Sequence, residues 1–195
     1  LWETPSMTAK QKLRKQYLKL RSNLNDNLLR KNEDRVLEVL KSSDIKLNGK
    51  KVSCYMSVKN EMGTKKLIKL LIAEGNKVFL PKMITYKKKL SFFEVKSFKD
   101  LRRNKIGILE PKGLHKIGPT ELDYIFMPCV CFDDKGFRVG MGQGYYDRSL
   151  DSIDQSQTKL IILAHEIQKT ESCYPEKHDI KADFCLTDKQ AYRFE

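Results

Sequence analysis

The sequence predicts an α/β protein, folded as a single-domain, three-layer α/β/α sandwich around a mostly parallel sheet. Segments with apolar residues at helical spacing alternate with short apolar runs typical of strands. Two of these runs, residues 123–132 and 159–166, are apolar at nearly every position, which indicates strands buried on both faces, as in parallel sheets. A chain of 195 residues suits one domain with a sizeable core, which we place at residues 8–195.

The first half of the chain predicts two helices, then a strand, a third helix and two more strands. Thr8 and Gln11 form the T-x-x-Q capping box that begins the first helix. We expect helices at residues 9–24, 27–41 and 65–75, the last capped by Thr64, strands at 50–56, 77–81 (closed by Pro81) and 89–95, and a Lys-rich solvated turn at 85–90.

The second half contains the most apolar segments. Besides the strands at 123–132 and 159–166, it predicts a short closing strand at 183–187 and a helix that begins at Tyr145. Residues 1–6, which precede Met7, are expected to be a cloning remnant.

An excess of positive charge is the unusual feature of the composition. The chain has 38 Lys and Arg residues against 25 Asp and Glu residues, a net charge of +13. Such a field attracts nucleic acid, acidic membranes, nucleotides and small multi-anionic substrates without choosing among them. No apolar signal core follows the basic start, and the longest apolar run is far short of the roughly 20 residues that span a bilayer. We expect a soluble, cytoplasmic protein with no membrane partner.

Five cysteines are present, an odd number without a CxxC pair. They are Cys54, Cys129, Cys131, Cys173 and Cys185. We expect them to be buried, reduced, small apolar side chains in a reducing compartment, because the other ligands of a zinc site are missing. Cys129 and Cys131 are two apart in an apolar run and are expected to face one side of a strand.

The stretch DDKGFRVGMGQGYYDRSL, residues 133–150, holds four glycines within nine residues. Glycine loses more conformational entropy on folding than any other residue. Four glycines so close together therefore predict a backbone that a bound group must approach closely. The loop follows a buried strand and precedes a helix, where open α/β sheets bind ligands and where backbone N–H groups can face phosphate oxygens. Its spacing, G-M-G-Q-G, is neither the dinucleotide fingerprint nor a Walker A loop.

Residues 136–148, GFRVGMGQGYYDR, resemble the signature G-x-R-[LV]-G-x-G-x-G-Y-Y-D of the 5-formyltetrahydrofolate cyclo-ligase family at every fixed position. Other segments agree in order: KQKLR, YMSVKNEMGT, GILEP, FMPCVCFDDKGFR and YPEKHDIKADFCLTD. The resemblance runs from about residue 10 to residue 188. It implies a Rossmann-like sandwich, related to those of sugar-phosphate isomerases and CoA-transferases, and a ligase of one-carbon metabolism.

The implied reaction uses ATP and Mg²⁺ to convert 5-formyltetrahydrofolate to 5,10-methenyltetrahydrofolate, with release of ADP and phosphate. Phosphorylation turns the formyl oxygen into a good leaving group, and the folate N10 then attacks the activated carbon. The enzyme must align two polyanions and stabilise the transferring phosphoryl group. We expect a monomer whose partners are ATP and folate, including polyglutamylated folate attracted by the surplus charge, and not nucleic acid.

The resemblance also implies roles for individual residues. ATP is expected to contact Lys10, Gln11, Lys12, Leu13 and Arg14 on the first helix and Arg138, Val139, Gly140, Met141, Gly142, Gln143, Gly144, Tyr145 and Tyr146 in the loop. Folate is expected to contact Met56, Glu61, Met141, Gly142, Gln143, Gly144 and Tyr145. Arg138, Tyr145 and Tyr146 are expected to be catalytic, and Asp147 and Asp183 to bind Mg²⁺, which prefers oxygen ligands. His115, His165 and His178 receive no catalytic role; His178 is expected to support the loop that carries Asp179.

Other interpretations compete with these roles. Lys10 and Arg14 share a helix face at i, i+4, as solvated basic residues also do. Asp147 suits the first turn of a helix with or without a metal, and Glu61 could be an exposed loop acid. A basic nucleic-acid-binding protein is a second functional class, although Lys and Arg are spread along the chain without interleaved aromatic residues. An isomerase or transferase of the same fold would not consume ATP.

Overall fold

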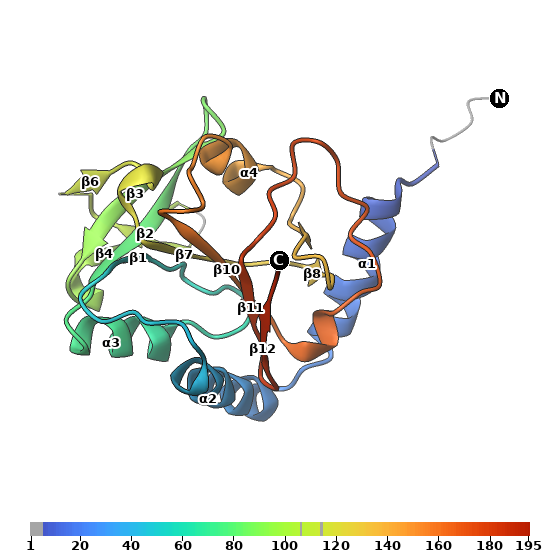
Figure 1. Cartoon of the computed structure of the whole chain (residues 1–195), viewed down its shortest axis with the longest axis horizontal. Coiled ribbons are helices and arrows are strands. Elements are labelled where there is room, and N and C mark those ends of the chain that lie inside the picture. The colour runs from blue at the N-terminus through green and yellow to red at the C-terminus, as the bar shows by residue number, and fades with distance from the viewer. Residues whose placement is uncertain (1–5, 106, 114) are drawn as a thin grey trace.

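The computed structural model describes residues 6–105, 107–113 and 115–195, which form a mixed sheet with helices on both sides (Figure 1). Its eight described strands lie in the order β12-β11-β10-β7-β1-β2-β3-β6. Their bounds are β1 (Lys51–Ser53), β2 (Lys77–Ile84), β3 (Lys89–Val95), β6 (Lys116–Ile117), β7 (Tyr124–Met127), β10 (Lys159–Leu163), β11 (Phe184–Leu186) and β12 (Ala191–Arg193). The neighbours from β11 to β2 are parallel, and β12, β3 and β6 are antiparallel additions at the two edges. The predicted mostly parallel α/β fold is confirmed.

The helices cover the sheet unequally. They are α1 (Ala9–Ser22), α2 (Asp26–Ser42), α3 (Lys65–Ala73) and α4 (Tyr145–Leu150), with short 3-10 turns η1 (Phe98–Asp100), η2 (Pro119–Glu121) and η3 (Glu166–Gln168). In Figure 1, α2 and α3 lie on one side of the sheet and α4 on the other, while α1 stands at the end of the molecule beside β8. The remaining strands form two ribbons, β4 (Leu101–Arg103) with β5 (Leu109–Pro111) and β8 (Cys131–Phe132) with β9 (Arg138–Val139).

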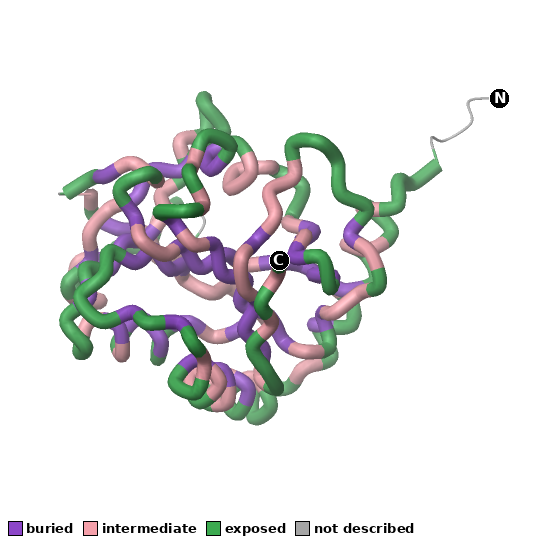
Figure 2. Tube along the Cα trace, viewed as in Figure 1, coloured by how far each residue is buried: buried purple, intermediate pink, exposed green. Residues whose placement is uncertain are grey.

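The two central strands β7 and β10 alternate between the two faces of the sheet. Phe126 and Ile161 pack into the cluster that includes the apolar side chains of α2 and α3. Met127 and Ile162 pack into the cluster on the opposite face, which includes Leu150 of α4. Because both faces are covered, every position after the first residue of each strand, Tyr124 and Lys159, is apolar and buried (Figure 2), as the sequence predicts.

The predicted continuous strand at 123–132 is wrong. β7 ends at Met127, and Pro128, which has no N–H to donate to a ladder, separates it from β8, which pairs with β9 instead. The break also divides the two cysteines expected on one strand face. Cys129 packs in the sheet core with Met127, whereas Cys131 packs in a separate cluster with Tyr17 of α1.

Two expected element boundaries also differ. Pro81 does not close its strand, because β2 leaves its pairing with β1 after Phe79 and continues to Ile84 beside β3, with one open edge where proline is tolerated. Thr64 does not cap α3 with its side chain. Its hydroxyl donates to Tyr55 O (2.6 Å) and accepts from Ser57 N (3.0 Å), which closes the loop between β1 and α3.

The capping box at Thr8 and Gln11 is confirmed, and both of its hydrogen bonds are present. No helix in the described part of the chain has the length and apolar character required to cross a membrane. The expectation for residues 1–6 falls on residues 1–5, outside the described residues, and on the exposed Ser6.

Candidate functional site

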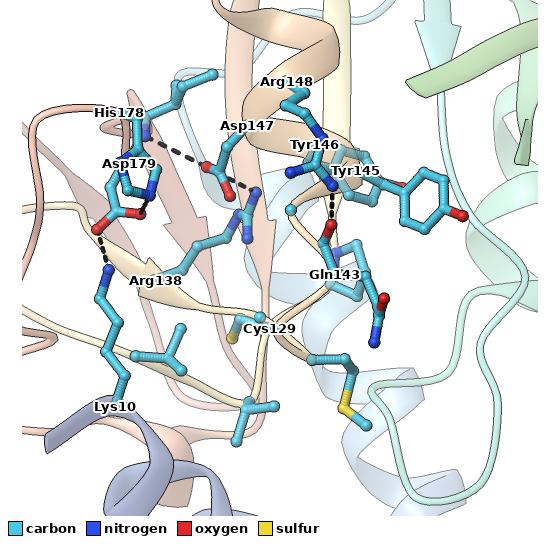
Figure 3. Close-up of a pocket in the computed structure, with 18 of the residues that line it drawn as sticks. Lys10, Cys129, Arg138, Gln143, Tyr145, Tyr146, Asp147, Arg148, His178 and Asp179 are labelled. Atoms are coloured by element: carbon cyan, nitrogen blue, oxygen red, sulfur yellow. Dashed lines mark hydrogen bonds and ion pairs between the residues drawn. The ribbon is translucent and has the colours of Figure 1, made fainter. Parts of the chain in front are cut away.

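A cavity of about 920 Å³ opens beyond the carboxyl ends of β1 and β7, at the large end of the range for small-molecule pockets (Figure 3). Its walls come from α1, the loop between β9 and α4, residues 176–180 and the β2–β3 hairpin. We call the end lined by Arg21, Glu61 and residues 128–130 the floor. The position agrees with the expectation that ligands bind at the carboxyl edge of a parallel sheet.

The glycine loop, residues 140–144, forms one wall of this cavity. Gly142 and Gly144 have φ values of +91° and +66°, which favour glycine over any residue with a Cβ. Arg14 reaches across from α1, and its Nε donates to Gly140 O at 2.8 Å. The helix that follows the loop, α4, has only six residues, so side chains supply most of the positive charge at this wall.

Three guanidinium groups from different elements lie directly against the three glycines of the loop. The closest approaches to the position that a Cβ would occupy are 3.2 Å for Arg138 at Gly140, 3.2 Å for Arg14 at Gly142 and 2.9 Å for Arg148 at Gly144. Arg148 also donates to Gln143 O and, at 3.1 Å, to Lys88 O on the β2–β3 hairpin. Glycine is favoured at 142 and 144 by the positive φ values, and the bare backbone of the loop lets the arginine side chains pack closely against it.

Arg138 is buried and is held between an acid and an aromatic ring. Its Nη2 lies 3.4 Å from Asp147 Oδ1, and its guanidinium lies 5.5 Å from the centre of the Tyr146 ring. Its Nε has no hydrogen-bond partner among the described groups. Burial raises the pKa of Tyr146 well above the usual value despite the nearby Arg138, so this phenol stays protonated and can donate.

Lys10 lies in an acidic corner of the cavity. Its ammonium group contacts Glu176 Oε2 at 3.0 Å and also Asp179 Oδ2, as Figure 3 shows for the second pair. Desolvation opposes the charge of Lys10, but the bonds to Asp179 and Glu176 outweigh it and raise the Lys10 pKa. Burial likewise opposes the charge of Asp179, but the bond from Lys10 prevails and lowers the Asp179 pKa. The corner therefore holds a charged pair at neutral pH.

The floor carries one acid and one base. Glu61 is half-buried, and its Oε2 accepts from Val58 N at 2.9 Å. Burial raises the pKa of Glu61, opposed by Val58 N–H and by Arg21. Arg21 is buried and donates to Cys129 O at 3.2 Å. Arg21 was not among the residues expected at the site, although its spacing from Lys10 and Arg14, i+11 and i+7, places all three on one helix face.

Several residues expected at the site lie elsewhere. Gln11 is exposed and uses its side chain in the capping box, Lys12 is exposed, and Leu13 packs against the cluster around Tyr17. The 100° rotation per residue explains this, since Lys10 and Arg14 face the cavity and the three residues between them turn away. Met56 packs against the α2–α3 core rather than lining the cavity. The other loop and helix residues expected at the site, from Arg138 to Asp147, do line it.

The two expected metal ligands are not brought together. Asp147 lines the cavity, whereas Asp183 lies at the start of β10 and β11, where Oδ2 accepts from Leu160 N (2.8 Å) and Gln155 Nε2 (3.1 Å). The corner residues Glu176, His178 and Asp179 instead bring three ligand atoms within 4.8 Å of one another. His178 is exposed, and its Nε2 lies 3.8 Å from Asp179 Oδ1, so its supporting role stays a prediction.

The cysteines do not contribute a reactive group. All five are buried and unpaired. Burial raises the pKa of Cys54 to about 12 and also raises that of Cys129, the only one of the five that lines the cavity as described. Both remain thiols at neutral pH.

The sequence profile of the 5-formyltetrahydrofolate cyclo-ligase family matches residues 6–188. The 5-formyltetrahydrofolate cyclo-ligase of Haemophilus influenzae is 32% identical over 88% of this chain and 93% of its own length, and that of Saccharomyces cerevisiae is 30% identical over 91% and 94%. An Aquifex aeolicus 5,10-methenyltetrahydrofolate synthetase solved by NMR has a TM-score of 0.83 at 31% identity, covering 96% of this chain and 94% of its own. A Mycoplasma pneumoniae 5,10-methenyltetrahydrofolate synthetase, at 23% identity and a TM-score of 0.74, shares the fold.

The contacts of Asp183 predict a structural role. Asp183→Ala removes the acceptor for Leu160 N and leaves this N–H without its partner, so the free energy of unfolding should fall by about 1–3 kcal/mol in urea titrations. Asp134→Ala is the matched control, because Asp134 is exposed and pairs only with Lys169 at the surface. If Asp183→Ala unfolded like the wild type but needed more Mg²⁺ for activity, a metal role would replace the structural one.

Proposed function

Because the chain belongs to the 5-formyltetrahydrofolate cyclo-ligase family, we propose that its cavity binds ATP and 5-formyltetrahydrofolate together and closes the formyl group into the 5,10-methenyl ring. The chain is a ligase of one-carbon folate metabolism. The observation that carries the assignment to this cavity is its pairing of two chemically different ends. Cations surround the glycine loop, and a half-buried carboxylate lies at the floor.

The cationic end suits the ATP phosphates. Arg14, Arg138 and Arg148 reach the loop from three elements, and Lys10 lies beside it in the acidic corner. The guanidinium groups are held in place before a ligand arrives, which reduces the entropy cost of binding a polyanion. Bidentate donors of this kind match phosphate oxygens and stabilise charge on a transferring phosphoryl group.

The floor suits the pterin ring. A carboxylate at Glu61 can accept from the amino and ring N–H groups of the amino-pyrimidinone edge, as acidic residues do with amino-bearing bases. Arg21 lies close enough to lower the Glu61 pKa, which favours the ionised, accepting form against the effect of burial. Tyr145 and Gly142 also line the cavity, and we place the formyl group and N10 beside them.

The reaction follows from this side-by-side placement. The formyl oxygen attacks the γ-phosphorus of ATP and ADP leaves; N10 then attacks the activated formyl carbon, loses its proton, and phosphate departs. We assign Arg138 the role of stabilising the charge that develops on the transferring phosphoryl group. Tyr146, kept protonated by burial, and Tyr145 are assigned as donors to the same transfer.

Carboxylate oxygens in the cavity fit Mg²⁺, which takes one or two carboxylates together with substrate phosphates and water. Asp147 and, in the acidic corner, Glu176 and Asp179 are the candidates, and Asp183 is not among them, because its carboxylate is used at the far end of β10. A bound Mg²⁺ would neutralise phosphate charge. Lys10 now contacts two of these acids and would be free to turn towards phosphate.

The direct test mixes the protein with Mg·ATP and 5-formyltetrahydrofolate and follows the methenyl chromophore. We expect product only when both ligands are present, with one ADP released per product. Methenyl formation at the same rate without ATP, or ATP hydrolysis without folate consumption, would contradict the assignment.

The two ends of the cavity should be separable by mutation. Lys10→Ala with Arg14→Ala should raise the KM for ATP about 10-fold or more through lost charge-assisted contacts, and change the KM for folate little. Lys15→Ala with Lys19→Ala is the control, since it removes the same charge from exposed positions at the same spacing on α1. If this control variant had the same effect, net charge rather than local contact would explain the result.

Glu61→Gln should raise the KM for folate about 10-fold and leave that for ATP unchanged. It should also raise the unfolding temperature at pH 7. Burial raises the Glu61 pKa above 4.5, so the folded state binds the proton more tightly, and keeping Glu61 ionised at higher pH costs stability. The gain should vanish below about pH 4.5, where Glu61 is protonated whether the chain is folded or not. A variant less stable than the wild type at pH 7 would contradict this explanation.

Gly142→Ala should impair ATP use beyond its effect on stability. The new Cβ would lie 3.2 Å from Arg14 Cζ and displace that guanidinium, so activity should fall at least ~10-fold, about 1.4 kcal/mol of transition-state stabilisation. Gly49→Ala is the matched control, because Gly49 has a similar φ of +67° with no atom within 4 Å of its Cβ position. Equal losses of activity in the two variants would show that backbone strain alone is responsible.

A further inference from the structure

A turn behind the floor of the cavity joins its two sides without lining it, and its Ile167 is exposed on the outer side. The turn comprises His165 and η3 (Glu166–Gln168) and directly follows the central strand β10. His165 and Gln168 are buried, at 0% and 1% exposure. Sequence analysis assigned His165 no role, and neither residue reaches the cavity surface.

The hydrogen bonds of His165 define one protonation state. Its Nε2 lies 3.1 Å from Asn60 O, which can only accept, so Nε2 carries a proton. Its Nδ1 lies 3.0 Å from Asn32 Nδ2, and the Asn32 Oδ1 has no hydrogen-bond partner among the described groups. With the amide in this orientation Nδ2 donates, Nδ1 accepts and the ring is neutral. Burial lowers the pKa of His165, in agreement with this neutral form.

On one side, the ring holds the loop that carries Glu61. Asn60, which accepts from the ring, directly precedes Glu61, and its own amide donates to Arg21 O at 3.1 Å. Glu61 is fixed in turn by bonds to Val58, through its backbone N–H (3.1 Å) and through Oε2 (2.9 Å). The direction of the Glu61 carboxylate therefore depends on where Asn60 is held.

On the other side, the same turn holds the segment after β7. His165 N donates to Gln168 Oε1 at 2.8 Å, and Gln168 Nε2 donates to Cys129 O (2.9 Å) and Val130 O (3.0 Å). Cys129 and Val130 line the floor opposite Glu61. The turn thus links the two sides of the floor, alongside Arg21, which donates to Cys129 O and accepts from the Asn60 amide.

We propose that His165 is a positioning residue for the folate end of the cavity: its neutral ring holds Asn60 and thereby places Glu61 at a set distance from the Cys129–Val130 segment. It acts without touching either ligand. The inference rests on the proposed function, because it takes the Glu61 end as the folate subsite. Small displacements of a binding carboxylate are costly, and supporting hydrogen bonds of this kind prevent them.

The first test replaces the ring's hydrogen bonds but keeps its volume. His165→Phe leaves Asn60 O and Asn32 Nδ2 without partners, and we expect the KM for 5-formyltetrahydrofolate to rise about 10-fold or more, with the KM for ATP within about 2-fold of the wild type. Thr158→Val is the control for general destabilisation. Thr158 is equally buried and hydrogen-bonded, to Leu122 O, but precedes the other end of β10. Equal effects of both variants on the two KM values would overturn the proposal.

A second variant keeps the contact to Asn60 while changing the charge of the ring. Asn32→Asp places a carboxylate at Nδ1 and favours the imidazolium, which donates to both partners. We expect this variant to keep a folate KM within about 3-fold of the wild type, unlike His165→Phe. A folate KM as high as that of His165→Phe would show that the bond to Asn60 does not position the loop.

The pH dependence gives an independent readout. The charged side chains that act on the ring are Arg21 from α1 and Asp188 after β11, and the backbone of Asn60 and Glu61 in the β1–α3 loop also contacts it. The carboxylate of Glu166, in its own turn, is bonded instead to Thr187 and Tyr192. Protonation would set Nδ1–H against the N–H of the Asn32 amide. The stabilisation that the neutral His165 ring gives the folded state is therefore present above about pH 6.5 and is lost as pH falls towards the lowered pKa of His165 in the folded state.

As pH falls, protonation of the His165 ring should therefore raise the folate KM of the wild type. In Asn32→Asp, where the charged ring is already favoured, only the rise that comes from protonation of Glu61 itself should remain. Identical profiles would contradict the role of His165. The failures are distinguishable: an inactive wild type would refute the proposed function, whereas an active wild type with an unaffected His165→Phe variant would refute only the positioning role.

Discussion

Packing of arginine side chains on a glycine backbone is the constraint on which the cavity depends. Guanidinium groups from α1, β9 and α4 all contact residues 140–144, and a Cβ on any of the three glycines would lie within about 3 Å of one of them. The contact joins elements that are far apart in the chain, because Arg14 also donates to Gly140 O. The glycines thus give cations from three elements access to the same short stretch of backbone, which concentrates positive charge on one wall.

Docking of α1 makes this arrangement possible. Tyr17, between Arg14 and Arg21 on the same helix face, is buried in the cluster with Val130 and Val139, and its hydroxyl donates to Lys169 O at 2.9 Å. One helix therefore supplies Lys10 and Arg14 to the cationic wall and Arg21 to the floor. Desolvation opposes the charged form at both ends. At Lys10 the neighbouring acids outweigh it and raise the pKa, whereas at Glu61 desolvation prevails and raises the pKa of the carboxyl group.

A second layer of buried polar groups lies beneath the residues that face the cavity. His165 donates to the carbonyl of Asn60, and Gln168 donates to those of Val130 and Cys129, the last of which it shares with Arg21. Such groups are expensive to leave unpaired, so the turn resists displacement and transmits its rigidity to the floor. The stable central strand β10, from which the turn begins, anchors this layer to the core.

The sequence alone determined the features that depend on local patterns. These are the parallel core, which two apolar runs predict, the α1 capping box, and the glycine loop at the carboxyl edge of the sheet. These follow from periodicity and backbone preference, which act over a few residues. The break between β7 and β8 at Pro128 and the outward direction of Gln11 to Leu13 also follow from local features, a proline and the helical rotation. Tertiary structure decided the rest: Asp183 went to the far end of β10, and Arg21 and His165 joined the cavity or its support. The physical reason is that a side chain's partner across the fold, often more than a hundred residues away, sets its direction and charge, and no local pattern encodes that partner.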